Sequence, residues 1–191
     1  QNVRRELPVD SVSWYECQEF MRRLIQLMPA LMWQLPSEAE WEYACRAGTT
    51  TPFSTGENIT TAQANYDGND PYAYFDKGEC RETTVPVKSF APNLWGLYQM
   101  HGNVSEWCDG PWRDKALAQQ REAIEPADEK YPPQGVVQQV RSDEQTYVLR
   151  GGSWCSDGQD SRSAHRFDLR ADDRGSFIGL RLSLGHELQG R

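Results

Sequence analysis

The sequence predicts an α+β domain with two helices, short antiparallel strands and long ordered loops. Two Ser-to-Glu capping boxes, each followed by an apolar helical face, lie within residues 1–48. Beyond them come short strand-like fragments, separated by stretches rich in Thr, Asn, Asp and Gly. The seven tryptophans and eight tyrosines suit a core built largely from loops, because each buried ring covers a large area.

The first helix is predicted over Trp14–Met28. Ser13 and Glu16 form its capping box, and Pro29 ends it. Its apolar face consists of Cys17, Phe20, Met21, Leu24 and Met28. The second helix begins after Ser37, with Glu40 completing the box, and stops at Gly48.

Strands are expected at Val85–Phe90, Gly96–Met100, Val104–Trp107, Tyr147–Arg150 and Ile178–Leu182. Residues 49–81 read as ordered loops. The charged, Gln-rich stretch from about 113 to 145, which contains two consecutive prolines, is expected to be a surface insertion, and residues 185–191 a tail. One domain over residues 1–184 suits a chain of 191 residues.

Composition narrows the function classes. The net charge of −8 disfavours nucleic acid, which needs a basic surface. The five cysteines form no CxxC pair and the three histidines are scattered, which argues against a structural zinc site. No stretch approaches the roughly 20 apolar residues of a membrane span, and residues 1–10 contain no signal core, so a soluble protein of unknown compartment is expected.

Five segments carry a family resemblance: PVDSVSW (8–14), LPSEAEWEYA (35–44), PNLWGLYQMHGNVSEW (92–107), RGGSW (150–154) and IGLR (178–181). In order and spacing they resemble the formylglycine-generating enzymes, or sulfatase-modifying factors. The resemblance covers nearly the whole chain and implies a variant of the C-type lectin fold. Family members usually have further strands before the first segment, so the first strands of the fold are expected to be missing or supplied elsewhere.

Two calcium positions are also implied by the resemblance. Asn103 and Glu106, with the carbonyl of Val104 between them, place oxygen ligands in a tight turn, and oxygen is what calcium prefers. Asn65 with the carbonyl of Tyr66 resembles a second position. The alternative is that these side chains only cap turns by hydrogen bonding.

The cysteine pair that oxidising members of the family use is incomplete. In the family, the first cysteine lies two residues after the aromatic of the GGS-aromatic segment, the second follows shortly, and both bind copper as thiolates. Here the first position is Ser156, while Cys155 lies one place early and no cysteine follows it. Cys155 is therefore only a weak catalytic candidate, and copper is not expected. Iron on the histidines is disfavoured too, because they form no helix-spaced motif.

The segment after Trp154 alternates between a fixed frame and irregular positions. This pattern resembles the variable proteins of diversity-generating retroelements, in which adenines of AAC codons are replaced. Codons derived from AAC exclude Lys, Glu, Met, Gln and Trp, and none of these occupies an irregular position. These positions are Cys155, Ser156, Asp157, Gly158, Asp160, Ser161, His165, Phe167, Asp168, Leu169, Asp173, Gly175, Ser176 and Phe177.

The sequence therefore predicts a non-catalytic, ligand-binding module of a prokaryotic or phage-type protein. It would bind a protein or other macromolecule through residues 155–177, with apolar anchors surrounded by acids. The scaffold would be packed by Trp14, Trp41, Trp95, Trp107 and Trp154, and the arginines Arg162, Arg166, Arg170, Arg174 and Arg181 would pair with nearby acids. The alternatives are an oxidoreductase of the sulfatase-modifying type and an accessory or regulatory relative fused to a partner.

Overall fold

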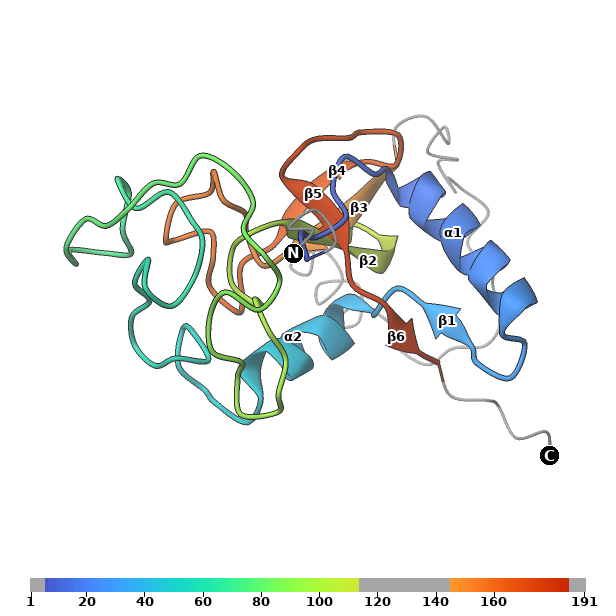
Figure 1. The fold of residues 1–191 in the computed structure, drawn as a ribbon, viewed down its shortest axis with the longest axis horizontal. Helices are drawn as coiled ribbons and strands as arrows, with labels where there is room; N and C mark the ends of the chain where they lie inside the picture. Colours follow the sequence, from blue (N-terminus) through green and yellow to red (C-terminus); the bar gives the residue numbers. More distant parts are fainter. Residues whose placement is uncertain (1–5, 114–144, 186–191) are drawn as a thin grey trace, which may run out of the picture.

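The computed structural model describes residues 6–113 and 145–185. Their regular elements are, in order, α1 (Trp14–Leu27), β1 (Trp33–Gln34), α2 (Glu38–Arg46), β2 (Ser105–Pro111), β3 (Thr146–Arg150), β4 (Phe167–Arg170), β5 (Ile178–Leu180) and β6 (Ser183–Leu184) (Figure 1). The α+β class is confirmed. The predicted insertion and tail lie outside the described residues, apart from their ends. No helix within the two described ranges has the length and apolar character needed to cross a membrane.

Both helices begin at the predicted capping boxes. The Ser13 hydroxyl accepts from the Glu16 N–H, and the Glu16 carboxylate accepts from the Ser13 N–H at 2.8 Å. Ser37 and Glu40 repeat this arrangement before α2. The second helix ends at Ala47, which adopts a left-handed conformation with φ of 46°. Local sequence therefore determined where both helices begin.

The main sheet has four strands in the order β4-β3-β2-β5. β3 runs antiparallel to both β2 and β4, and a separate antiparallel pair joins β1 to β6. The pairing of β5 with β2 is parallel, with Ser105 opposite Ile178, and so differs from the predicted antiparallel arrangement. An antiparallel bridge between Asp10 and Gly179 lies beside β5, so the chain entering α1 covers part of that sheet edge (Figure 1).

Two predicted strands were wrong. Residues 85–90 and 96–100 form turns and bends. In the first, the Val85 N–H donates to the Asn103 side chain at 2.9 Å instead of to a strand. In the second, Gly96 and Gln99 have φ of 80° and 51°, which interrupts an extended backbone. Three strands went unpredicted: β1 and β6 are only two residues long, and β4 lies within the irregular segment.

The sheet buries side chains on both faces. One cluster gathers Cys17, Met21, Leu35, Trp107, Leu149 and Ile178 beneath α1. A second gathers Trp41, Cys45, Met100, Cys108 and Val148 beneath α2. Since adjacent strand residues point to opposite faces, Trp107 and Cys108 serve different clusters. A third cluster, of Phe53, Ile59, Ala64 and Tyr66, packs the loops.

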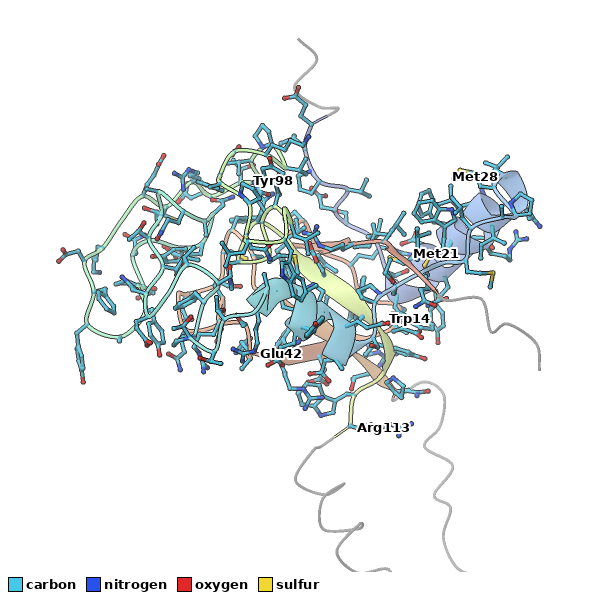
Figure 2. The ribbon with its side chains drawn as sticks, turned by 90° about the horizontal axis from the view of Figure 1, so that it is seen from below. Trp14, Met21, Met28, Glu42, Tyr98 and Arg113 are labelled. Atoms are coloured by element: carbon cyan, nitrogen blue, oxygen red, sulfur yellow. The ribbon has the colours of Figure 1, made fainter. Side chains whose placement is uncertain are left out.

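The tryptophans fill different roles in this core. Trp41 and Trp107 are fully buried. Trp14 stacks on Tyr147 with ring centroids 4.0 Å apart, at the end of α1 that meets the sheet (Figure 2). Trp95 was wrongly assigned to the core: it is 47% exposed and makes an edge contact with Tyr43.

Candidate functional site

A hollow of about 370 Å³ opens where the loops after β3 meet the loop that follows residue 66. We call it the acidic hollow. From the irregular segment it is lined by Cys155, Ser156, Asp157, Asp160, His165, Phe167 and Phe177. The rest of its lining is Asp67, Asp70, Ser105, Leu149, Gly152 and Ser153. Residues far apart in the sequence thus share one concave surface, which is the usual form of a ligand site.

The glycine pair after β3 shapes the entrance to this hollow. Gly151 and Gly152 have φ of 96° and 70°, a region that favours glycine. A Cβ on Gly152 would lie 2.8 Å from the Ser161 hydroxyl, so the two loops meet closely there. Trp154 then anchors the loop, its N–H donating to the Asn103 carbonyl at 3.0 Å and its indole to the Ser176 carbonyl at 3.1 Å.

A small hydroxyl and thiol group lies at one wall. Ser153 Oγ is 3.3 Å from Cys155 Sγ and 3.1 Å from Ser156 Oγ. The Ser153 N–H also donates to Ser156 Oγ at 3.0 Å. Cys155 is exposed, whereas Ser153 is buried. The position that would hold the first family cysteine therefore carries a serine hydroxyl, which bonds within its own turn.

The acidic side chains of the hollow are partly tied to their own loops. Asp157 Oδ1 accepts from the Asp160 N–H at 2.8 Å. Asp160 Oδ1 lies 3.3 Å from His165 Nδ1. Burial lowers the pKa of His165, and the neighbouring Asp160 opposes that shift only in part. His165 therefore adds no positive charge to the hollow at neutral pH.

A family model described as "Sulfatase-modifying factor enzyme 1-like domain" matches residues 1–184. The chain belongs to this family. It is 36% identical over 175 residues to the serine/threonine-protein kinase Pkn1 of Chlamydia trachomatis, covering 91% of this chain and 24% of that one. It is 31% identical over 182 residues to the formylglycine-generating enzyme of Streptomyces coelicolor, covering 91% and 51%. The chain thus spans about a quarter of the chlamydial kinase and half of the Streptomyces enzyme.

Solved structures agree on the fold. PvdO from Pseudomonas aeruginosa matches with a TM-score of 0.68 and 28% identity, covering 94% of this chain and 62% of PvdO. Treponema denticola variable protein 1 matches with a TM-score of 0.65 and 24% identity, covering 93% and 70%. At that identity the second likeness shows the fold alone.

The family's two-thiolate copper site does not fit the residues present. Among the five cysteines, Cys155 alone lines the hollow. Cys17, Cys45 and Cys108 are buried in the core, and burial raises the pKa of both Cys17 and Cys45 to about 12. A thiol that stays protonated is a poor metal ligand.

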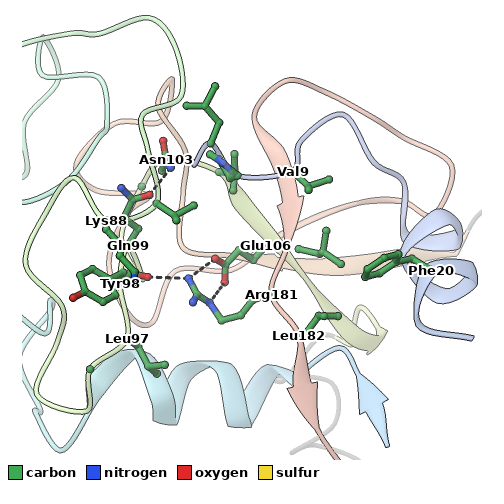
Figure 3. Close-up of a pocket in the computed structure, with 17 residues that line it drawn as sticks. Val9, Phe20, Lys88, Leu97, Tyr98, Gln99, Asn103, Glu106, Arg181 and Leu182 are labelled. Carbon is green, nitrogen blue, oxygen red and sulfur yellow. Dashed lines mark hydrogen bonds and ion pairs between the residues drawn. The ribbon is translucent and has the colours of Figure 1, made fainter. Parts of the chain in front are cut away.

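Glu106 and Asn103, predicted as calcium ligands with the carbonyl of Val104, are engaged by protein groups. Both Glu106 oxygens accept from the Arg181 guanidinium, at 2.8 and 2.7 Å (Figure 3). One of them also accepts from the Trp41 indole at 2.7 Å. Asn103 Oδ1 accepts from the Asn65 amide and the Val85 N–H. This arrangement does not fit a calcium ion at Glu106, because a guanidinium occupies the place of the cation.

Asn65, predicted as a calcium ligand with the carbonyl of Tyr66, is different. Its amide nitrogen donates to the Thr83 carbonyl at 2.9 Å and to Asn103, but its side-chain oxygen is buried without a partner. A buried acceptor with no donor is unusual in a native fold. The Asn65 oxygen therefore remains open to water or a cation, and calcium there stays a prediction.

The irregular positions outside the hollow fall into two groups. Asp168 and Leu169 lie on β4, and Asp173, Gly175 and Ser176 lie between β4 and β5. Gly158 and Ser161, by contrast, are buried. A Cβ on Gly158 would lie 2.4 Å from the Tyr72 nitrogen, so its backbone leaves no room for a side chain. These two positions hold the loops together and do not contribute to a display surface.

The apolar anchors proposed from the sequence differ in exposure. Phe167 is 46% exposed at the hollow. Leu169 and Phe177 are half-buried and touch the cluster beneath α1. Phe167 is thus the anchor most open to a ligand.

The predicted arginine pairing is confirmed for four of the five side chains. The pairs are Arg166 with Glu38, Arg170 with Asp172, Arg174 with Glu16 and Arg181 with Glu106. Arg162 instead donates to the Gln159 carbonyl at 2.7 Å.

Sequence reasoning missed Asp67, Asp70 and Ser105 as residues of the hollow. Asp67 Oδ1 accepts from the Asn69 N–H, which closes a turn. The Asp-Gly-Asn-Asp run in residues 67–70 signals this turn, but nothing in the sequence places it beside residue 157.

The sequence analysis also missed a second hollow of about 550 Å³. It is lined by Val9, Phe20 and Leu182 among others, and the Arg181–Glu106 pair lies in its wall (Figure 3).

Proposed function

We propose that this chain is a ligand-binding module that acts through the acidic hollow and does not oxidise cysteine. The observation that carries the proposal is the shared lining: Cys155, Ser156, Asp157, Asp160, His165, Phe167 and Phe177 come from one segment and meet in one concavity. A pocket of a few hundred Å³ suits a side chain or a short peptide stretch. The half-exposed Phe167 supplies an apolar anchor at its edge.

The side chains in the wall of the acidic hollow support a binding role without cysteine oxidation. Cu(I) is held by soft thiolate ligands, and a serine hydroxyl is a hard, neutral donor. The residue two places after Trp154 is Ser156, which bonds to Ser153. A competition titration with a Cu(I) chelator tests this: we expect wild type and Cys155→Ser to bind copper equally weakly. Stoichiometric copper binding that Cys155→Ser abolishes would return the chain to the oxidising enzymes.

We further propose that the hollow belongs to a variable protein of a diversity-generating retroelement. The support is the residue types at the irregular positions, together with their accessibility everywhere except at Gly158 and Ser161. Sequencing the DNA downstream of the gene tests this. We expect a near-copy of the segment coding for 150–182, differing at adenines and lying beside a reverse transcriptase. Without such a copy, the chain would be an ordinary family relative with drifted loops.

A second candidate is an accessory module of a longer protein. It is favoured by the chlamydial kinases, of which this chain matches about a quarter. Binding through the hollow serves either role, because a module that docks a partner also needs a ligand surface. Sequencing the whole reading frame separates the two: a kinase-like segment in the same chain supports the accessory role, and its absence removes it.

Calcium at Asn65 and the Tyr66 carbonyl is proposed as a structural ion, supported by the unpartnered Asn65 oxygen. With a dissociation constant of about 0.1–1 mM, at the weak end of protein calcium sites, about 5 mM calcium would stabilise the fold by roughly 1–2 kcal/mol. We expect the same rise in melting temperature for wild type and Glu106→Gln. If calcium raised the melting temperature of neither protein, the ion at Asn65 would be excluded. If calcium raised the melting temperature of wild type but not of Glu106→Gln, the ion would instead bind at Glu106.

A further inference from the structure

The acidic hollow carries an unbalanced negative charge. Its lining includes Asp67, Asp70, Asp157 and Asp160, and it includes no lysine or arginine. Lys77 helps to lower the pKa of Asp67 through its positive charge, but it lines a neighbouring hollow and not this one. Several carboxylates within one concavity and no cation among them create a field that favours a positive ligand group.

These carboxylates retain oxygens that a ligand can reach. Among the described residues, the Asp70 side chain has no hydrogen-bond or ion-pair partner. Asp157 uses Oδ1 for the Asp160 N–H, and Asp67 uses Oδ1 for the Asn69 N–H and amide. Asp157 therefore has its Oδ2 free of any described hydrogen bond, whereas the Asp67 carboxylate also accepts from the Cys80 thiol. Unsatisfied carboxylate oxygens are strong acceptors for charged N–H donors.

An unpartnered hydroxyl on a largely buried serine provides a second, independent sign of a ligand. Ser105 lines the hollow at the start of β2 and is only 7% exposed. The Ser105 N–H donates to the Phe177 carbonyl at 2.8 Å, but the Ser105 hydroxyl has no hydrogen-bond partner in the part of the chain that the structure describes. Buried polar groups in native folds are normally hydrogen-bonded. A polar ligand group that enters the hollow would meet this need.

Aromatic side chains lie beside the acids. Asp157 also lines a shallower hollow with Tyr74 and Phe75, and Tyr74 is fully exposed. Ring faces attract cations, and exposed rings on loops mark interaction surfaces. The aromatic edge and the carboxylates thus favour the same kind of ligand group.

We propose that the acidic hollow binds the cationic side chain, arginine or lysine, of a peptide or protein ligand. This inference rests on the proposed binding function and gives the ligand a chemical class. A bare metal ion is a poorer occupant, because no three His, Cys, Asp or Glu side chains in residues 6–113 and 145–185 converge closely enough to hold one. A guanidinium spans spread carboxylates with its fork of donors.

The test is a selection of random linear 12-residue peptides, displayed on phage, against the full chain. Peptides that act through the hollow are identified by loss of binding after the exposed Cys155 is labelled with a bulky maleimide. We expect these peptides to share an arginine or lysine. Binding should fall at least tenfold when that residue is replaced by citrulline or norleucine, and at least tenfold in Asp157→Asn/Asp160→Asn.

The matched control is Asp109→Asn/Asp172→Asn, which removes the same charge from two exposed aspartates outside the hollow and should change binding less than twofold. Peptides that need the hollow but share no cationic residue would overturn this inference and leave the proposed binding function standing. If maleimide labelling blocked none of the selected peptides, the proposed function itself would fail.

Discussion

Replacing Arg181 by methionine should destabilise the fold far more than removing an exposed arginine. Arg181 holds Glu106 through two hydrogen bonds of 2.8 and 2.7 Å, and Glu106 is 5% exposed (Figure 3). Breaking a buried pair leaves an uncompensated charge and costs about 3–5 kcal/mol. Because the Arg181 side chain is 28% exposed, water reaches the site, and we expect the lower end, about 3 kcal/mol.

The matched control is Arg174→Met. Its partner is Glu16, and both side chains are about half exposed, so solvent screening should make the loss much smaller than for Arg181→Met. Urea unfolding followed by tryptophan fluorescence measures both free energies. In a domain of this size, a loss of 3 kcal/mol corresponds to a fall in melting temperature of roughly 6–12 °C.

A double-mutant cycle isolates the pair. The double variant Arg181→Met/Glu106→Gln has no buried charge, and the glutamine side chain at position 106 still offers the Trp41 indole an acceptor. Its loss in free energy of unfolding should therefore be smaller than the sum of the losses in the two single variants. We expect a coupling energy of about 2 kcal/mol. Additivity within about 0.5 kcal/mol, or equal losses for Arg181→Met and Arg174→Met, would refute the buried-pair account.

Three further predictions concern the loops and the site. Burial lowers the pKa of His101 from 6.5 to about 4, so unfolding takes up a proton once the pH falls below about 6.5. The free energy of unfolding should therefore drop by about 2 kcal/mol between pH 7 and pH 5, and His101→Gln should lose that part of the pH dependence. Gly158→Ala should cost about 2–3 kcal/mol in urea unfolding, because its Cβ would lie 2.4 Å from backbone, whereas Asp157→Ala should change stability by less than about 1 kcal/mol. A thiol reagent should label the exposed Cys155 in the native protein within minutes and the buried Cys45 only on unfolding; equal rates would contradict the placement of the two thiols.

The elements that sequence predicted well are those with local causes. The capping boxes of Ser13 and Ser37 involve partners three residues away, so both helix starts followed from the sequence. The fold class and family also followed, because five motifs in order constrain one another. The wrong strands at 85–90 and 96–100 have non-local causes: Val85 is held by Asn103, which no periodicity reveals.

Only the part of the site that comes from the irregular segment was predictable from the sequence. The irregular segment identified most residues that line the hollow, since they are neighbours in the chain. Asp67 and Asp70 join them through tertiary contacts, such as the Asp67 N–H donating to the Ser156 carbonyl at 2.8 Å. Composition also could not separate Gly158 from its neighbours, because the backbone of Pro71 and Tyr72 is what leaves no room for a side chain at that position.

The measurement that tests the central claim most directly is the folded fraction of two libraries, read by protease resistance. One randomises Cys155, Ser156, Asp157, Asp160 and His165, which line the acidic hollow. The other randomises Gly151, Gly158, Ser161 and Ser163 of the same loops, which are buried and do not line the hollow. A display surface predicts that most members of the first library fold and few of the second do. Equal losses in both would contradict the account, because the hollow would then be part of the packed scaffold.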